Sequence, residues 1–126
     1  MTDSIERLYE GVIAARHGDP ARSRTARLLR SGRAKMAKKL AEEAVEVVID
    51  AMNGSRDAVV KESADLLYNL VVLWVAAGVQ PKEVWKEMER RERLFGIAEK
   101  LLKTPAEADP RRKVVALETR RVRKRR

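Results

Sequence analysis

The chain has 126 residues, the size of one domain with a modest core, and 37% of them are charged. It has no cysteine, which excludes disulfides, thiolate metal sites and a cysteine nucleophile, and predicts a cytoplasmic protein. The formal net charge is +9, but residues 111–126 hold nine Lys or Arg and one Glu, so residues 1–110 are nearly neutral. The longest apolar run, 66–79, has 14 residues, whereas a membrane span needs roughly 20. We therefore expect a soluble protein that does not enter a membrane, and no signal peptide, because the N-terminus is too polar for one.

Apolar residues recur at three- and four-residue spacings along the chain, which predicts an all-α fold. The first helix begins after Asp3 or Ser4 and ends before the helix breakers of residues 17–20. A short helix follows from Thr25 to Arg30, closed by the Ser-Gly pair at 31–32.

Two long helices come next, joined by a tight turn. The first runs from about Ala34 to Met52 and the second from Arg56 to about Ala77, with Asn53-Gly54 between them and Ser55 as the N-cap of the second. The first carries an apolar stripe typical of an amphipathic helix: Met36, Leu40 or Ala41, Ala44, Val45, Val48, Ile49 and Met52. The second is apolar on most sides in its later half, so we expect that half to be buried.

A last helix starts at Pro81 and extends through Leu102. Thr104-Pro105 marks the end of the compact domain, which we place at residues 1–104. Residues 105–126 have no apolar period long enough to build a core, and we expect a flexible basic tail there.

Carboxylates recur at three- and four-residue spacings within both long helices. In EEAVE, Glu46 lies three residues after Glu43 and four after Glu42, so each pair shares a helix face. On the next helix, Glu62 and Asp65 are again three apart, beside a very apolar run. An ionised carboxylate that loses its water at such a place costs several kcal/mol unless a cation replaces the water.

The tight turn brings these two acidic pairs to one level. Glu46 and Glu62 each lie about eight residues from the turn, roughly 12 Å from its tip at 1.5 Å per residue, in two antiparallel helices. Four or five converging carboxylates suit a hard cation, Mg²⁺ or alternatively Mn²⁺. The simpler alternative is a solvated acidic face paired with Lys or Arg.

Basic residues continue the same helix face upstream. Lys35 and Lys39 stand at four-residue steps before Glu43, and the short helix before them carries Arg24 and Arg27. Carboxylates that hold a divalent cation beside a basic cluster suit a polyphosphate, because the cation and the bases together neutralise the phosphate oxygens.

The acidic motif EExxE…ExxD, here EEAVE at 42–46 and ESAD at 62–65, resembles that of the MazG-like all-α nucleotide pyrophosphohydrolases. Three blocks, RTARLL (24–29), KMAKKLAEEAVEVVIDAMNG (35–54) and ESADLLYNLVVL (62–73), resemble the phosphoribosyl-ATP pyrophosphohydrolase family in particular. The likeness covers about residues 4–92.

This resemblance implies a helical bundle completed by dimerisation and a Mg²⁺-dependent attack of water between the α- and β-phosphates. Pyrophosphate would leave phosphoribosyl-ATP, giving phosphoribosyl-AMP in histidine biosynthesis. The metal ligands it implies are Glu43, Glu46, Glu62 and Asp65, with Glu42 as a further ligand or the base that orients water. Lys38 and Lys39 match the family's basic pair and would contact phosphate.

Three positions depart from the family's common residues: Arg24 replaces Tyr, Ala41 replaces Gly and Asn69 replaces His. Asn69 is four residues past Asp65, on the metal-facing stripe, and replaces a titrating imidazole by an amide. A diverged paralogue that acts on another nucleotide therefore remains an alternative. Two further alternatives are a non-catalytic helical dimer that binds nucleic acid through its basic tail, and a purely structural partner protein.

Overall fold

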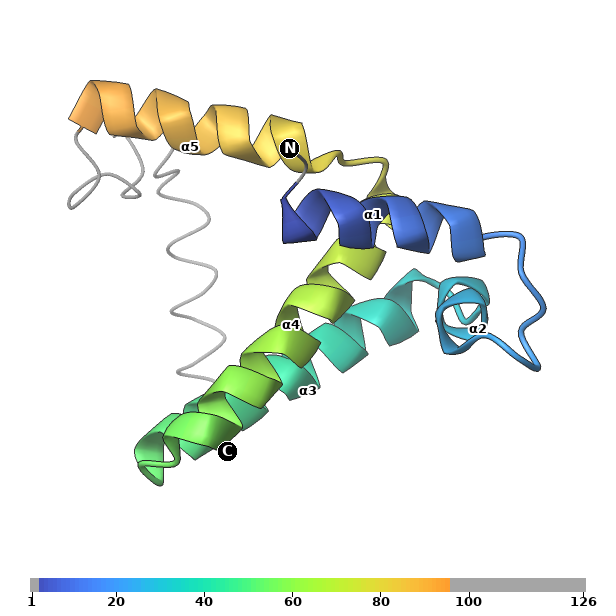
Figure 1. Ribbon diagram of the computed structural model, residues 1–126, viewed down its shortest axis with the longest axis horizontal. Coiled ribbons are helices and arrows are strands. Elements are labelled where there is room, and N and C mark those ends of the chain that lie inside the picture. The colour runs from blue at the N-terminus through green and yellow to red at the C-terminus, as the bar shows by residue number, and fades with distance from the viewer. Residues whose placement is uncertain (1–2, 96–126) are drawn as a thin grey trace, which may run out of the picture. The chain divides into compact units, whose positions relative to one another are not determined.

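The structure, a computed structural model, describes residues 3–95. Within this range all regular structure is α-helical, which confirms the predicted all-α class. The helices are α1 (Ser4–Ala15), α2 (Arg24–Arg30), α3 (Arg33–Met52), α4 (Arg56–Ala77) and α5 (Pro81–Phe95) (Figure 1). The predicted end of the last helix at 102, the domain end at 104 and the basic tail lie outside the described residues.

The helix ends follow the capping chemistry of the sequence. The Asp3 side chain accepts a hydrogen bond from the backbone N–H of Glu6 at 2.7 Å, and that of Ser23 accepts one from Ala26 at 3.1 Å. Gly78 ends α4 in the left-handed conformation, with φ of 74°. Ser55 occupies the N-cap position of α4, but its side chain makes no capping hydrogen bond, contrary to the prediction.

Helices α3 and α4 form an antiparallel hairpin and pack along each other (Figure 1). Gly54, with φ of 72°, allows the tight turn between them. The core lies where α1 crosses the later half of α4, and its buried residues are Val12, Met36, Val71, Val72 and Val75. The predicted burial of the second half of α4 is confirmed, and this packing fixes the hairpin against α1.

The later half of α3 is not covered by the rest of the described chain. Met36, in the first turn, is buried, whereas Val48 is 60% exposed and Met52 is 81% exposed. Further exposed apolar side chains belong to α3 and α4, and we call the whole set the hairpin face: Val45, Val48, Ile49, Met52, Val60 and Leu67. The helices of this hairpin are longer than α1 and α2 can cover, so much of the predicted stripe faces outward.

A side-chain hydrogen bond fastens α2 to the hairpin. The hydroxyls of Thr25 and Tyr68 lie 2.6 Å apart and are partly buried. Because α2 is only seven residues long, this bond is an important constraint on its position.

Replacing Tyr68 by Phe is expected to lower the free energy of unfolding by about 1 kcal/mol, because the Thr25 hydroxyl loses its partner while the ring stays. Chemical denaturation followed by circular dichroism measures this. Tyr9→Phe is the control, since it removes a hydroxyl from another tyrosine packed on the core. Equal stability of the two variants would show that the bond does not hold α2.

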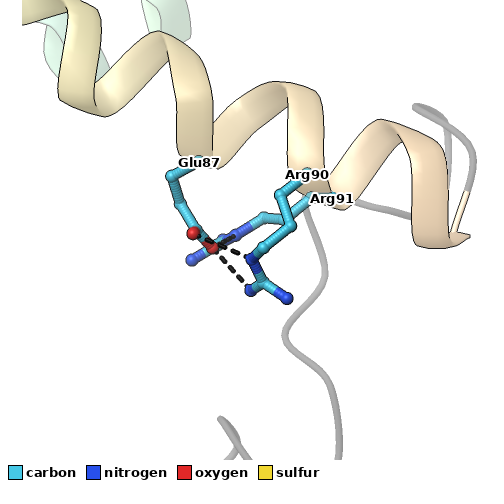
Figure 2. Close-up of polar contacts among 3 residues, drawn as sticks. All are labelled: Glu87, Arg90 and Arg91. Atoms are coloured by element: carbon cyan, nitrogen blue, oxygen red, sulfur yellow. Dashed lines mark hydrogen bonds and ion pairs between the residues drawn. The ribbon is translucent and has the colours of Figure 1, made fainter.

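Helix α5 passes from a first compact unit, which ends at Val84, into a second that begins at Trp85. In the second unit the Glu87 carboxylate accepts hydrogen bonds from Arg90 at 2.7 and 3.0 Å and from Arg91 at 2.8 Å (Figure 2). These hydrogen bonds, first from Arg90 and then from Arg91, lower the pKa of Glu87 to about 2. The cluster is local to one helix face and reinforces α5.

Within residues 3–95, no single helix combines the length and the apolar character that crossing a membrane requires. Helices α4 and α5, which are bent relative to each other, meet the criteria of length and apolar character only when they are counted as one segment.

Candidate active site

A cavity of about 530 Å³ opens where α2 meets the hairpin of α3 and α4. Its walls differ in charge. One end is acidic, lined by Glu43, Glu46, Glu62 and Asp65; the wall toward α2 and the start of α3 is basic, lined by Arg24, Arg27, Lys35 and Lys39. Leu28, Tyr68 and Asn69 contribute neutral side chains to the same cavity. The size is that of a small-molecule site.

Three carboxylates converge at the acidic end. Glu43 comes from α3, and Glu62 and Asp65 come from α4; one oxygen of each lies within 4.8 Å of those of the other two. Their three-residue spacing within α4 and the antiparallel packing of the hairpin produce this convergence. Such an arrangement of like charges does not stabilise the helices themselves.

The carboxylate cluster favours the protonated form of Glu62. A hydrogen bond to Glu43, then desolvation, and then the charges of Glu46, Glu43 and Asp65 raise the pKa of Glu62 to about 7. The other Glu62 oxygen, Oε2, is buried and has no hydrogen-bond partner among residues 3–95. The pKa of Glu43 is lowered, first by the hydrogen bond with Glu62 and then by that with Lys39.

Lys39 connects the acidic and basic walls. Its Nζ lies 3.1 Å from a carboxylate oxygen of Glu43, and this hydrogen bond raises the pKa of Lys39. The lysine is four residues before Glu43 on α3, so both side chains share one helix face. Lys39 thereby places one positive charge directly against the acidic end, and the other cationic side chains of the cavity are Arg24, Arg27 and Lys35.

The donor set fits a hard divalent cation. All three converging groups offer carboxylate oxygens, and the buried Oε2 of Glu62, which has no hydrogen-bond partner in the described part of the chain, could be satisfied by a bound cation. The described residues therefore contain an acidic cluster able to hold a metal ion.

Two of the residues predicted for the site lie elsewhere. Glu42 and Lys38 do not line the main cavity but a neighbouring one on α3, which shares Lys39, Glu43 and Glu46 with it. Glu46 lines both cavities but does not belong to the group of three converging carboxylates. Arg24, Arg27, Lys35, Lys39 and Asn69 all line the main cavity, as Glu43, Glu62 and Asp65 do.

Comparison with known proteins identifies the family of the chain. The family model for phosphoribosyl-ATP pyrophosphohydrolase matches residues 6–92, which is more than half of the chain and includes every wall of the cavity. The chain belongs to the phosphoribosyl-ATP pyrophosphohydrolase family. The resemblance seen in the acidic motif is thereby confirmed, and with it the prediction of an enzyme.

Relatives of this family member match it over different lengths. A protein named phosphoribosyl-ATP pyrophosphatase 2 from Bradyrhizobium diazoefficiens is 65% identical and covers 99% of both chains. One of the same name from Rhodopseudomonas palustris is 63% identical over 100% of both. The phosphoribosyl-ATP pyrophosphatase of Granulibacter bethesdensis is 54% identical, over 76% of this chain and 60% of its own. The likeness to the first two therefore extends beyond the matched domain.

Tyr68 lines the cavity as well, although it is not among the site residues that the sequence predicts. It follows Asp65 by three residues, so a helical wheel places it beside the carboxylate face. The same spacing could have identified it. The contribution of Leu28 depends on how α2 packs, which no spacing in the sequence reveals.

The folded protein binds the proton of Glu62 more tightly than the unfolded chain does. The Glu62 carboxyl has an ordinary pKa of 4.5 in the unfolded chain and of about 7 in the fold, so between these values the folded protein holds the extra proton. Raising the pH across this window therefore lowers the stability of the metal-free protein. The lowered pKa of Glu43 acts in the opposite sense, but only below 4.5.

We accordingly expect the melting temperature of the metal-free protein to fall between pH 5 and pH 7.5, and the stabilisation by millimolar Mg²⁺ to be larger at pH 8 than at pH 6. Thermal unfolding monitored with EDTA or Mg²⁺ across this range measures both. The pH slope should be smaller in Glu62→Gln, which cannot titrate at this position. An identical slope in that variant would assign the effect to other groups.

Proposed function

We propose that this chain catalyses the Mg²⁺-dependent hydrolysis of phosphoribosyl-ATP to phosphoribosyl-AMP and pyrophosphate, a step of histidine biosynthesis. The proposal rests on the cavity in which an acidic end built from α3 and α4 meets a basic wall. The names of the relatives supply the substrate. A cytoplasmic location, as the lack of cysteine suggests, belongs to the same proposal.

Glu43, Glu62 and Asp65 would hold the Mg²⁺, with Glu46 as a fourth ligand from the same cavity. Mn²⁺ would fit the same oxygens. When bound, the cation supplies positive charge to phosphate oxygens and lowers the pKa of bound water. The proton on Glu62 leaves when its carboxylate takes up that role.

The basic wall would bind the phosphates. Arg24 and Arg27 approach the cavity from α2, and Lys35 and Lys39 from α3, so the cations surround a chain of phosphates from two directions. Guanidinium groups bind phosphate oxygens in pairs, while ammonium groups act as point charges. Holding the anhydride between this wall and the acidic end orients the bond between its α- and β-phosphates.

Glu42 and Lys38 take part in the proposal from the neighbouring cavity. Glu42 would be a further ligand or the base that orients water, and Lys38 would contact phosphate. That cavity is also lined by Val45 and Ile49, two members of the hairpin face. A second subunit on this face would cover the cavity and exclude water beside Glu42.

A homodimer is therefore part of the proposal. The hairpin face presents six large apolar side chains with exposed fractions from 44% to 81%. Scattered exposed apolar residues are ordinary, but a set that recurs at helical spacing on two packed helices is typical of an interface. Pairing of two hairpins through this face would complete the bundle that the family resemblance implies. Such dimers could also assemble into a higher oligomer.

The substrate is tested by pyrophosphate release from phosphoribosyl-ATP and from a panel of nucleoside triphosphates at equal concentration. We expect phosphoribosyl-ATP to be preferred by at least tenfold in kcat/KM, and Glu46→Gln to reduce its turnover strongly. Preference for another nucleotide would make the chain a paralogue with a changed pocket, in line with Arg24, Ala41 and Asn69. Release from none of them by folded protein would refute the proposal.

A further inference from the structure

Asn69 is the one polar or charged residue that is fully buried among residues 3–95. It lies on α4, four residues after Asp65, is 3% exposed and lines the cavity. Its side-chain Nδ2 donates a hydrogen bond of 2.8 Å to the backbone carbonyl of Asp65. Its Oδ1 is buried and has no hydrogen-bond partner in the described part of the chain.

The orientation of this amide is fixed by its one bond. Turning the amide over would place Oδ1 against the carbonyl oxygen of Asp65, and two acceptors would then face each other. The group left without a partner is therefore the acceptor. Buried polar atoms in native proteins nearly always find a partner, so this oxygen calls for a donor that the protein does not supply.

The chemistry of Oδ1 restricts what can lie against it. A phosphate oxygen is an acceptor and cannot pair with it, and the phosphates have their partners on the basic wall. The partner must carry an O–H or N–H group. A nucleotide hydroxyl is one source of such a group, and a water held by a cation on the nearby carboxylates is another.

We propose that Asn69 is a ligand-positioning residue whose Oδ1 accepts a hydrogen bond from an O–H group brought into the cavity by the bound ligand. The inference rests on the proposed function for the kind of ligand, a nucleotide with its cation. Different parts of the cavity then bind different groups of the ligand: the basic wall binds phosphate, and the buried amide selects a hydroxyl or water.

Two substitutions separate this role from a structural one. Asn69→Leu keeps the size of the side chain but removes both donor and acceptor. Asn69→Thr keeps a donor, because a threonine hydroxyl within a helix can donate to the carbonyl four residues back, while a methyl group replaces the carbonyl oxygen. A purely structural role in holding Asp65 predicts that the Thr variant behaves as the unchanged chain does.

The binding test uses the full chain and two probes. The first is Mn²⁺ alone, titrated calorimetrically without nucleotide. The second is α,β-methylene-ATP in Mg²⁺, which cannot be cleaved between those phosphates, together with its 2′-deoxy and 3′-deoxy counterparts. We expect both variants to bind at least one probe about five- to twentyfold more weakly, the effect of one hydrogen bond to a buried acceptor.

The two probes distinguish the source of the donor. Weaker Mn²⁺ binding without nucleotide assigns it to cation-bound water. Unchanged Mn²⁺ binding with weaker nucleotide binding assigns it to the nucleotide, and one deoxy analogue should then bind the unchanged chain and the Thr variant equally well.

The inference is overturned if folded Asn69→Thr and Asn69→Leu bind both probes within twofold of the unchanged chain, or if only Asn69→Leu is weakened. It is independent of the choice of substrate. If the unchanged chain fails to hydrolyse phosphoribosyl-ATP while the two variants still lose affinity, the proposed substrate fails and the role of Asn69 stands. If the unchanged chain hydrolyses phosphoribosyl-ATP but binds neither probe, the role of Asn69 fails and the proposed function stands.

Discussion

Replacing Glu62 by Gln is expected to abolish pyrophosphate release, by at least a hundredfold in kcat, and at the same time to raise the melting temperature of the metal-free protein at pH 8. The two effects have one cause. Glu62 stands within 4.8 Å, oxygen to oxygen, of Glu43 and Asp65, and the fold raises its pKa to about 7. Above that pH Glu62 adds a third negative charge to the cluster. The glutamine side chain of the variant removes this charge and also removes one carboxylate oxygen that could bind the metal.

Thermal unfolding in EDTA at pH 8, together with a pyrophosphate assay in Mg²⁺, measures both effects on one preparation. Glu10→Gln, on the exposed surface of α1, is the matched control and should change neither quantity. The combination is diagnostic, because a residue with a structural role loses stability together with activity. A Glu62→Gln variant that is less stable without metal, or that retains full turnover, would contradict the account of the cluster.

Placing a charge on the hairpin face is expected to dissociate the proposed homodimer. Val48 is 60% exposed on α3, so a lysine at this position should cost the single chain little. In a dimer packed through this face the same lysine would lose its water, and we expect self-association to weaken by at least about a hundredfold. Activity should fall with it, because Val45 and Ile49 line the cavity that contains Glu42.

Sedimentation velocity over a range of protein concentrations measures the association of Val48→Lys. Ile13→Lys is the control, since Ile13 is also an exposed apolar residue but lies on α1, away from the hairpin face. Helix content by circular dichroism shows whether each variant is folded. An unchanged dimer in Val48→Lys, or a monomer in the unchanged chain, would remove the hairpin face as the interface.

The hairpin and its acidic face could be predicted because they depend on local geometry. A helical period of 3.6 residues fixes which carboxylates share a face, and a short turn at Asn53-Gly54 forces its flanking helices to be antiparallel. Counting residues from the turn places Glu46 level with Glu62, whereas the carboxylate oxygens that converge in the structure are those of Glu43, Glu62 and Asp65. No knowledge of the remaining chain is needed for that count.

The rest of the site depends on packing between elements that are distant in sequence. The bond between Thr25 and Tyr68 spans 43 residues, and together with the packing of Leu28 and Leu29 on the core it joins α2, and with it the basic wall, to the rest of the fold. Spacing alone could not show that Asn69 has an unpaired oxygen. Nor could it separate an apolar stripe that packs on the core, as Met36 does, from one left for another subunit, as at Val48, because both have the same period.

We propose that the acidic and basic walls together form a metal-dependent site that cleaves phosphoribosyl-ATP between its α- and β-phosphates. The most direct test identifies the products by mass spectrometry after incubation with the full chain, in Mg²⁺ and in excess EDTA. We predict phosphoribosyl-AMP and pyrophosphate in equal amounts with Mg²⁺ and neither with EDTA. Formation of phosphoribosyl-ADP and phosphate, equal turnover in EDTA, or unchanged phosphoribosyl-ATP in both samples would contradict it.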